Sequence, residues 1–260
     1  MIKLNNSTIN ITIFPDKTSQ CWKLEDGLIK SDYNKIIWDF ENESEFMHLA
    51  QLCTLLKNTT TSHIALDIPY FPYARQDKEI SNESTFALRT FCKLLDSLEV
   101  NLIKTFDIHS SIAIEILKTP FINLTPEKEI ASLIEDSYID LIIYPDKGAK
   151  TRYNRLIGDI RSSIAFEKIR VQSTGIISGL KADNEALLEK SYNVLVVDDL
   201  CDGGMTFIKI AEYILKTKKE VCLTLYTSHG IYSRGTKVLF DSGYHKIFNK
   251  DGEIKNENKQ

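Results

Sequence analysis

The segment 194–207 constrains the fold of this 260-residue chain more than any other. Four apolar residues, Val-Leu-Val-Val, run directly into Asp198 and Asp199, and a turn with two glycines then leads into a segment with helical apolar spacing. Backbone N–H groups in such a turn and at a helix N-terminus attract phosphate, and carboxylates at a strand end suit ribose hydroxyls or Mg²⁺. The segment predicts a site for a phosphorylated ribose, although a buried strand followed by an acidic helix cap would use the same residue types.

Strands and helices alternate along the rest of the chain. The apolar patterns predict strands at 8–14, 20–24, 35–40, 63–68, 101–106, 140–144, 163–168, 171–177, 193–197 and 221–227. Helical spacing covers 44–57, 84–98, 126–135, 205–216 and 233–241. Strands separated by helices imply parallel sheets, so we expect two tandem Rossmann-like α/β domains, 1–125 and 126–248, and a polar tail that frays, 249–260.

The composition narrows the classes of partner. The formal net charge is −4 and the lysines are dispersed, so the sequence offers no basic field for nucleic acid. No apolar run approaches the ~20 residues that span a bilayer, and the first residues do not resemble a signal peptide. The five cysteines lie mostly in apolar runs without C-x-x-C spacing, which predicts reduced thiols. We expect a cytoplasmic protein with no nucleic-acid or membrane partner.

A second motif follows the predicted strand 63–68. The run Ile-Pro-Tyr-Phe-Pro-Tyr-Ala-Arg-Gln-Asp-Lys at 68–78 places Arg75, Gln76 and Asp77 beyond a strand's carboxyl end, where α/β folds bind ligands. An arginine can fork onto phosphate oxygens, Gln offers both a donor and an acceptor, and the Tyr and Phe faces suit an adenine ring. A proline-braced turn with a surface Arg–Asp pair is the structural alternative.

These two segments resemble the motifs of the phosphoribosyl pyrophosphate (PRPP) synthetase family. The run 68–78 is similar to the family's Pro-Tyr-x-x-Tyr-Ala-Arg-Gln-Asp-Arg/Lys loop, which type I phosphoribosyltransferases lack. The run 194–207 resembles the ribose-5-phosphate motif that both families share, with matches at Asp198, Asp199, Asp202 and Thr206. The resemblance implies two tandem phosphoribosyltransferase type I-like domains and, in a chain without the leading helical segment of typical members, a short form.

Further elements resemble the family's motifs in the family's order along the chain. They are Phe14-Pro-Asp16, Asp107-Ile-His109, Pro145-Asp146-Lys-Gly148, Lys168-Ile-Arg170 and Thr227-Ser-His229-Gly230. Taken alone, each is also a common structural sequence: a strand-end aromatic, a turn, or the solvated face of a hairpin. Because all five elements occur in one chain and in the family's order, the functional interpretation is stronger than the structural one.

The resemblance implies a diphosphate transfer from Mg·ATP to the anomeric hydroxyl of a ribose 5-phosphate unit, with release of AMP. It assigns ATP binding to Phe14, Asp16, Arg75, Gln76, Asp77 and His109. It assigns ribose-phosphate binding to Asp198, Asp199, Asp202, Gly203, Gly204, Met205 and Thr206, and Mg²⁺ binding to His109 and Asp146. Lys168 and Arg170 would neutralise charge on the transferring diphosphate. Family members form dimers or higher homo-oligomers with ATP at the subunit contact.

Two residues of the ribose loop differ from the family's motif and indicate which compound receives the diphosphate. Gly203 lacks a hydroxyl that the family places there, and Met205 replaces a glycine, so the loop is less suited to a compact 5-phosphate dianion. Short phage-encoded members that make ADP-ribose pyrophosphate for NAD⁺ synthesis resemble this chain, so we expect ADP-ribose in preference to ribose 5-phosphate. The alternatives are a PRPP synthetase acting only on ribose 5-phosphate, a phosphoribosyltransferase and a non-catalytic regulatory subunit.

Overall fold

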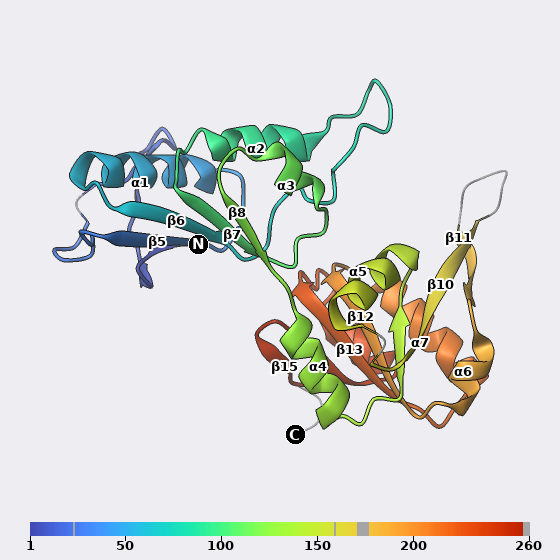
Figure 1. Ribbon diagram of the computed structural model, residues 1–260. Coiled ribbons are helices and arrows are strands. Elements are labelled where there is room, and N and C mark those ends of the chain that lie inside the picture. Colours follow the sequence, from blue (N-terminus) through green and yellow to red (C-terminus); the bar gives the residue numbers. More distant parts are fainter. Residues whose placement is uncertain (23, 159, 171–176, 257–260) are drawn as a thin grey trace. The chain divides into compact units, whose positions relative to one another are not determined.

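The structure is a computed structural model, and it describes all residues except 23, 159, 171–176 and 257–260. The chain divides into two compact units, Met1–Leu124 and Thr125–Gln260, and each contains its own sheet with helices (Figure 1). The sheets are rich in parallel strands, so the expected α/β class is confirmed. No helix within the described residues is long and apolar enough to cross a membrane.

The first unit contains a six-stranded sheet in the order β2-β1-β5-β6-β7-β8. The strands from β5 to β8 run parallel, and β1 joins β5 antiparallel. Their bounds are β1 Ile2–Leu4, β2 Ser7–Thr8, β5 Tyr33–Trp38, β6 His63–Ile68, β7 Leu102–Phe106 and β8 Phe121–Leu124. A separate antiparallel hairpin consists of β3 Thr12–Ile13 and β4 Ser19–Gln20.

The first unit's helices cover one face of its sheet (Figure 1). They are α1 Glu45–Thr59, α2 Ala87–Asp96 and α3 Ile112–Ile116. Alternation along β5 sends Ile36 and Trp38 into the same core as Leu52 of α1 and Leu95 of α2, all fully buried. The core therefore fixes the register of β5, since a shift by one residue would turn these side chains to the opposite face.

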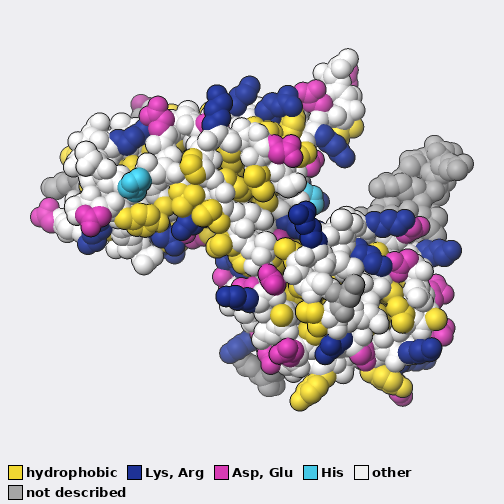
Figure 2. Space-filling view, viewed as in Figure 1, with side chains coloured by type: hydrophobic (Ala, Val, Ile, Leu, Met, Phe, Trp, Pro, Cys, Tyr) yellow, Lys and Arg dark blue, Asp and Glu magenta, His cyan; other side chains and the backbone are white. Residues whose placement is uncertain are grey.

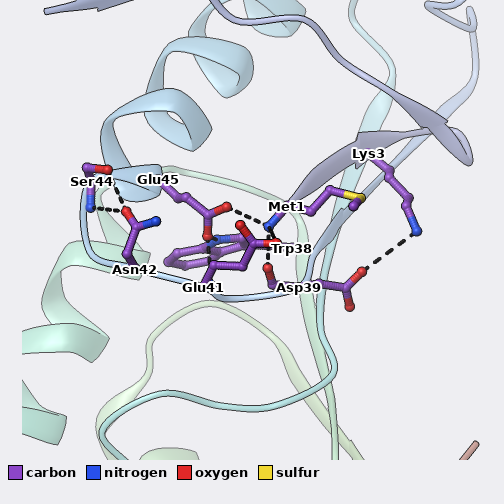
Figure 3. Close-up of polar contacts among 8 residues, drawn as sticks. All are labelled: Met1, Lys3, Trp38, Asp39, Glu41, Asn42, Ser44 and Glu45. Carbon is purple, nitrogen blue, oxygen red and sulfur yellow. Dashed lines mark hydrogen bonds and ion pairs between the residues drawn. The ribbon is translucent and has the colours of Figure 1, made fainter. Parts of the chain in front are cut away.

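Glu45, at the start of α1, gathers donors from three parts of the first unit (Figure 3). Its Oε1 lies 2.5 Å from the Met1 ammonium, and its Oε2 accepts from Trp38 Nε1 at 3.0 Å and from the Glu41 amide at 2.9 Å. Burial raises the pKa of this carboxyl, but the hydrogen bonds from the ammonium, the amide and the indole outweigh burial and hold its pKa below the ordinary value. The carboxylate thus ties the first strand to the first helix.

The second unit contains a seven-stranded sheet in the order β11-β10-β9-β12-β13-β14-β15. The five central strands, β10, β9, β12, β13 and β14, run parallel to one another. The two edge strands, β11 and β15, pair antiparallel with their neighbours. Their bounds are β9 Leu141–Tyr144, β10 Ser162–Arg170, β11 Ile177–Ala182, β12 Asn193–Cys201, β13 Cys222–Gly230, β14 Tyr244–Asn249 and β15 Gly252–Ile254. The sheet is central to the unit because helices pack against both of its faces.

Alternate residues of the buried strands face two separate cores. Val194 and Val196 of β12 pack with α6 Glu185–Lys190, α7 Met205–Thr217 and α8 Lys237–Asp241. Leu195 and Val197 pack with α4 Glu127–Asp136 and α5 Lys147–Ile157 on the opposite face. A strand that is apolar at every position is thus explained by burial on both faces.

Several elements differ from the expectations. The predicted strand 8–14 is divided between β2 and β3, because Ile9 turns into the core after pairing with Ile2. The helices α3, α5 and α6 and the strands β1, β8, β14 and β15 were not predicted, and β11 begins where the predicted strand 171–177 ends, most of which lies outside the described residues. The predicted fraying of 249–260 is wrong for its first part, because β15 pairs with β14 through a turn in which Gly252 has φ +119°.

Candidate active site

The acidic pair lies near the carboxyl end of β12, beside β13. Asp198 pairs in register with Thr227, and Asp199 is 6% exposed. Asp198 Oδ1 accepts a hydrogen bond from the Asp199 amide at 3.0 Å. Burial, then the neighbouring charge of Asp199 and a further contribution from Asp146, raise the pKa of Asp198 well above its ordinary value. The site therefore concentrates negative charge where a cation or a proton would be bound.

One cation lies close to this pair. Arg152 of α5 places Nη1 3.8 Å from Asp199 Oδ2, and the two side chains are 22% and 8% exposed. Arg152 follows Asp146 on the same helix, and the carboxylate of Asp146 caps that helix by accepting from the Ala149 amide at 3.0 Å. The predicted pyrophosphate loop around Asp146 is thus the first turn of α5.

The residues after the acidic pair form the expected turn into a helix. Gly204 is the N-cap of α7 with φ +76°, a left-handed conformation that glycine adopts without strain. A Cβ atom at Gly204 would also lie 2.9 Å from Leu239 Cδ2, so a side chain there would have to displace Leu239 in addition to adopting the left-handed conformation. Met205 and Thr206 open the 13-residue helix, whose free amides face the turn. This geometry suits a bound anion.

A segment that was not predicted to take part in the site covers this turn. After β13 the chain passes through 231–236, and the Ile231 and Tyr232 amides both donate to the Cys201 carbonyl, at 2.9 and 3.2 Å. Ser233 Oγ donates to Asp202 Oδ1 at 2.8 Å, and Arg234 Nη1 donates to Met205 Sδ at 2.8 Å. We name residues 231–236 the cover segment.

Lys168 and Arg170 lie near the end of β10, which neighbours β9. Their side chains lie outside the described part of the structure, so the predicted role in charge neutralisation stays a prediction. The second unit brings the carboxyl ends of β9, β10, β12 and β13 to one edge. The acidic pair lies within β12 near this edge, Asp146 follows β9, and the turn before α7 follows β12.

The predicted ATP-side residues belong to the first unit. Arg75, Gln76 and Asp77 follow β6, and His109 follows the neighbouring β7, so both loops leave the same edge of the sheet. Thr105 Oγ1 donates to the Ile68 carbonyl at 2.7 Å and joins the two strand ends. Arg75, Gln76 and His109 are exposed. The loop geometry therefore leaves these polar side chains accessible to a ligand.

Two aromatic residues of the same loop, Phe71 and Tyr73, pack against Phe91 of α2. Phe71 is 1% exposed and packs edge-on against Phe91 and Phe121, at centroid distances of 5.3 and 5.7 Å. Tyr73 packs against Phe91 at 5.1 Å, and its hydroxyl hydrogen-bonds Glu43. The predicted adenine platform is therefore wrong for Phe71, whose ring is part of the core that anchors the loop.

The two predicted metal ligands lie in different units. His109 belongs to the first unit and Asp146 to the second. Within the described residues, no group of three or more His, Cys, Asp or Glu side chains could hold a metal ion on its own. A hard cation such as Mg²⁺ commonly binds through one or two carboxylates together with substrate oxygens, and the acidic pair offers such a partial set.

Comparisons with known proteins bear on the whole chain. No family model matches it. A curated protein named ribose-phosphate pyrophosphokinase from Pyrococcus furiosus is 28% identical over 237 residues, which cover 88% of this chain and 80% of that protein. Another of the same name from Pyrococcus abyssi is 28% identical over 243 residues, which cover 90% and 81%. Over most of its length the chain is therefore similar to proteins named ribose-phosphate pyrophosphokinase.

A solved structure has the same fold. The crystal structure of phosphoribosylpyrophosphate synthetase from Mycobacterium smegmatis superposes with a TM-score of 0.75 over 93% of this chain and 79% of that chain, at 17% sequence identity. The likeness spans both units of the chain. It confirms the two tandem α/β units expected of a PRPP synthetase-like chain.

The predicted Phe14 element of the PRPP synthetase pattern forms the tip of the β3–β4 hairpin. Phe14 is 41% exposed, and Asp16 Oδ1 accepts from the Thr18 amide at 3.0 Å and from the Thr18 hydroxyl at 2.7 Å. The hydrogen bonds of Thr18 hold the pKa of Asp16 below its ordinary value. Asp16 is thus already engaged within its own turn, whereas the Phe14 ring is accessible.

Sequence reasoning missed Arg152, Ser233 and Arg234. Arg152 lies on α5, a helix hidden by the turn-like Asp-Lys-Gly at its start. Ser233 and Arg234 follow Thr227-Ser-His229-Gly230, the element that resembles a family motif, so their position after a strand end was the available signal. All three contact residues of the predicted ribose loop.

Proposed function

We propose that the protein is an ATP-dependent pyrophosphokinase that transfers the β,γ-diphosphate of ATP to the anomeric hydroxyl of a ribose 5-phosphate unit. The observation that carries this proposal is the acidic pair on β12, which leads directly into the left-handed turn at Gly204 and the start of α7. Carboxylates beside a helix N-terminus provide acceptors for ribose hydroxyls and amides for a phosphate at adjacent points. The relatives named ribose-phosphate pyrophosphokinase support the same assignment.

The chain's own residues position the two substrates. Asp198 and Asp199 would accept hydrogen bonds from the ribose hydroxyls, while the amides at the start of α7 and the Thr206 hydroxyl would hold the 5-phosphate. Arg75 and Gln76 would hold ATP. The anomeric oxygen then forms a bond to the β-phosphorus as the bond from that phosphorus to the α,β-bridging oxygen breaks. AMP leaves with the bonding electrons, and the hydroxyl proton is lost to solvent.

Charge neutralisation would supply much of the rate. Lys168 and Arg170 would balance the charge that accumulates on the transferring diphosphate, as cations do in phosphoryl transfer generally. Mg²⁺ fits the acidic pair, because Asp198 and Asp199 bring two oxygen-donor side chains together at the end of β12. When bound, Mg²⁺ would supply further positive charge to the phosphates.

We propose ADP-ribose as the preferred acceptor, in place of free ribose 5-phosphate. Two features of the loop support this. Gly203 has no hydroxyl to offer a compact phosphate dianion, and Met205, 47% exposed, adds an apolar side chain at the helix start. A 5-phosphate that carries a further substituent would extend outward past this side chain. The product would be ADP-ribose pyrophosphate, a compound suited to NAD⁺ synthesis.

The test is an assay of the purified protein with Mg·ATP and either acceptor. We expect AMP release that depends on an acceptor, with a higher kcat/KM for ADP-ribose than for ribose 5-phosphate, and a product with a new 1-diphosphate in ³¹P spectra. Release stimulated only by ribose 5-phosphate would overturn the acceptor preference and leave a PRPP synthetase.

A variant separates the enzyme from its non-catalytic alternative. Lys168→Ala is expected to lower kcat by at least about tenfold, the effect of ~1.4 kcal/mol on a barrier. Lys216→Ala is the matched control, because Lys216 lies in the last turn of α7, far along the helix from its start. A Lys168→Ala protein as active as its parent would contradict the proposed role, and absence of AMP release with both acceptors would contradict the proposed reaction.

A further inference from the structure

Arg234 is held against the ribose loop, although it belongs to none of the predicted site motifs. Its Nη1 donates to Met205 Sδ at 2.8 Å, and its stem lies beside Gly203, where a Cβ atom would come 3.3 Å from Arg234 Cδ. Both residues that it contacts are the ones at which the loop departs from the family's pattern. The arginine and the two departures form one structural unit.

The backbone of the cover segment is fixed, so the position of Arg234 is not that of a loose surface side chain. Two amides of the segment bond to the Cys201 carbonyl, Ser233 bonds to Asp202, and the Gly235 amide donates to the Tyr232 carbonyl at 2.7 Å. The Tyr232 ring fills the space beside Gly230, where a Cβ atom would come 1.8 Å from the ring. These contacts bind the segment to the end of β12.

The chemistry of the contact leaves the guanidinium available for an anion. A thioether is a weak acceptor, and a guanidinium has five N–H donors in a planar fork. Within the described residues, the Met205 sulfur is the acceptor that Arg234 contacts, and no ion pair joins Arg234 to a carboxylate. Arg234 and Met205 are both exposed at the outer rim of the turn.

We infer that Arg234 binds the distal phosphate of an acceptor whose ribose 5-phosphate is extended to a diphosphate, and that it thereby selects this class of acceptor over a 5-phosphate monoester. The inference rests on the proposed function and names the residue that sets its acceptor. The proximal phosphate would occupy the amides before α7, and the guanidinium would fork onto the next phosphate outward. Met205 is a positioning residue that steers the guanidinium through its sulfur.

The experiment compares Arg234→Gln, Arg234→Lys and the control Lys237→Gln with the parent protein. Lys237 lies in the same region but pairs with Asp241 four residues on, at 3.0 Å, and its side chain is 65% exposed. We would measure kcat/KM for AMP release with ADP-ribose and with ribose 5-phosphate, at two ionic strengths, and the thermal midpoint of each variant.

For Arg234→Gln we expect kcat/KM with ADP-ribose to fall roughly 10- to 100-fold, the effect of losing one charged hydrogen bond, while the value with ribose 5-phosphate changes by less than about threefold. Arg234→Lys would retain part of the preference because it keeps the charge but not the fork. Added salt would weaken the preference of the parent protein and not that of Arg234→Gln. Lys237→Gln would match the parent protein with both acceptors.

An equal loss with both acceptors, or no loss with either, would overturn the inference. Failure of the proposed function has a different signature, since the parent protein would then release no AMP with either acceptor. In that case, calorimetric titration of the parent protein and Arg234→Gln with ADP-ribose still tests the arginine: equal affinities of the two proteins would overturn its role.

Discussion

Arg152 of α5 and Asp199 of β12 join a helix to the strand that carries the acidic pair, with Nη1 and Oδ2 3.8 Å apart. Both side chains are largely shielded from water, at 22% and 8% exposure, so the interaction is less screened than a surface ion pair. The guanidinium carbon also lies 5.6 Å from the centroid of the Tyr153 ring. Arg152 thus holds the carboxylate of Asp199 in a defined position at the strand end.

Replacement of this arginine by methionine leaves two neighbouring carboxylates with less compensating charge. We expect Arg152→Met to lower the free energy of unfolding by about 1–3 kcal/mol. The loss should be larger at pH 8 than at pH 5, because the raised pKa of Asp198 favours its protonation as the pH falls, and this relieves the repulsion between the two carboxyls. Denaturant titrations at the two pH values measure it.

The control for this prediction is Lys150→Gln on the same helix. Lys150 Nζ lies 2.8 Å from Asp183 Oδ2, and both side chains are about a third exposed, at 30% and 32%. We expect a loss below about 1 kcal/mol with no dependence on the acidic pair. A stability loss for Arg152→Met that is equal at both pH values would mean that packing, and not charge, is what the arginine contributes.

A second prediction concerns Asp198. Its raised pKa means that the ionised carboxylate is less favourable in the folded than in the unfolded state, so it lowers the free energy of unfolding at neutral pH. A carboxyl whose pKa in the folded state exceeds its ordinary value of 3.8 favours the folded state at low pH, and this contribution is lost as the pH rises through the folded-state pKa. Asp198→Asn removes the charge of this partly buried carboxyl. We therefore expect this variant to be more stable than the parent protein at pH 7, by on the order of 1–2 kcal/mol, with a difference that shrinks toward pH 4.

The same variant should lose activity. Since Asp198 is proposed to accept a ribose hydroxyl, Asp198→Asn is expected to lower kcat/KM for AMP release by at least about tenfold. A gain in stability with a loss in activity is the combination that distinguishes a functional carboxylate from a structural one. Asp198→Asn that is destabilised at pH 7 would contradict the interpretation of the acidic pair.

The sequence could predict the strands that are apolar on both faces and the turn into α7. The expected strand 63–68 coincides with β6, and the expected helix 205–216 ends one residue short of α7. Apolar spacing did not reveal α5, because its first turn is Asp-Lys-Gly and only one narrow stripe, including Ala149, Tyr153 and Ile157, is buried. Weak amphipathic signal and a turn-like start together hid this helix.

The spacing of residues in the sequence does not predict which side chains contact one another around the site. Arg152 pairs with Asp199, and Arg234 donates a hydrogen bond to Met205. Both contacts form because the parallel strands end at one edge of the sheet. Which side chains meet there depends on register, which the sequence pattern does not specify between non-adjacent segments. The same holds for Phe71, which reads as an exposed aromatic of a binding loop and is a core residue.

The first unit offers a prediction unrelated to the site. On the face shown in Figure 2, acidic and basic side chains of the described residues are interspersed. Ion pairs between exposed side chains contribute little stability because solvent screens them. Glu45 is an exception, since it is buried and accepts from the Met1 ammonium at 2.5 Å. We expect Glu45→Gln to lose about 1–3 kcal/mol of unfolding free energy at pH 7.

The pH dependence of this loss follows from the lowered pKa of Glu45. A carboxyl with a lowered folded-state pKa contributes stability above its ordinary value of 4.5, and this contribution is lost as the pH falls through the folded-state pKa. The difference between Glu45→Gln and the parent protein should thus narrow below pH 4.5. Glu41→Gln is the control: its carboxylate lies 3.3 Å from the same ammonium but is 62% exposed, so its loss should stay below about 0.5 kcal/mol.

Substitution should destabilise the protein at Gly204 but not at the adjacent Gly203, although both glycines belong to the ribose loop. Gly204→Ala would place a side chain on a left-handed backbone, φ +76°, with its Cβ 2.9 Å from the Leu239 methyl. We therefore expect this variant to lose about 1–3 kcal/mol of unfolding free energy. Gly203→Thr restores a hydroxyl at a position without a positive φ, and its closest neighbour is the flexible stem of Arg234 at 3.3 Å. Gly203→Thr should therefore fold with a thermal midpoint close to that of the parent protein.

The consequence of Gly203→Thr for the acceptor follows from the same distance. A threonine side chain would displace the Arg234 stem from the turn and would add a donor for a compact phosphate dianion. We expect the ratio of kcat/KM for ribose 5-phosphate to that for ADP-ribose to rise by roughly tenfold, equivalent to about 1.4 kcal/mol of discrimination. Combined with Arg234→Gln the two changes should be non-additive, because both act on one guanidinium. Additive effects on the ratio would show that the hydroxyl and the arginine contact the acceptor independently.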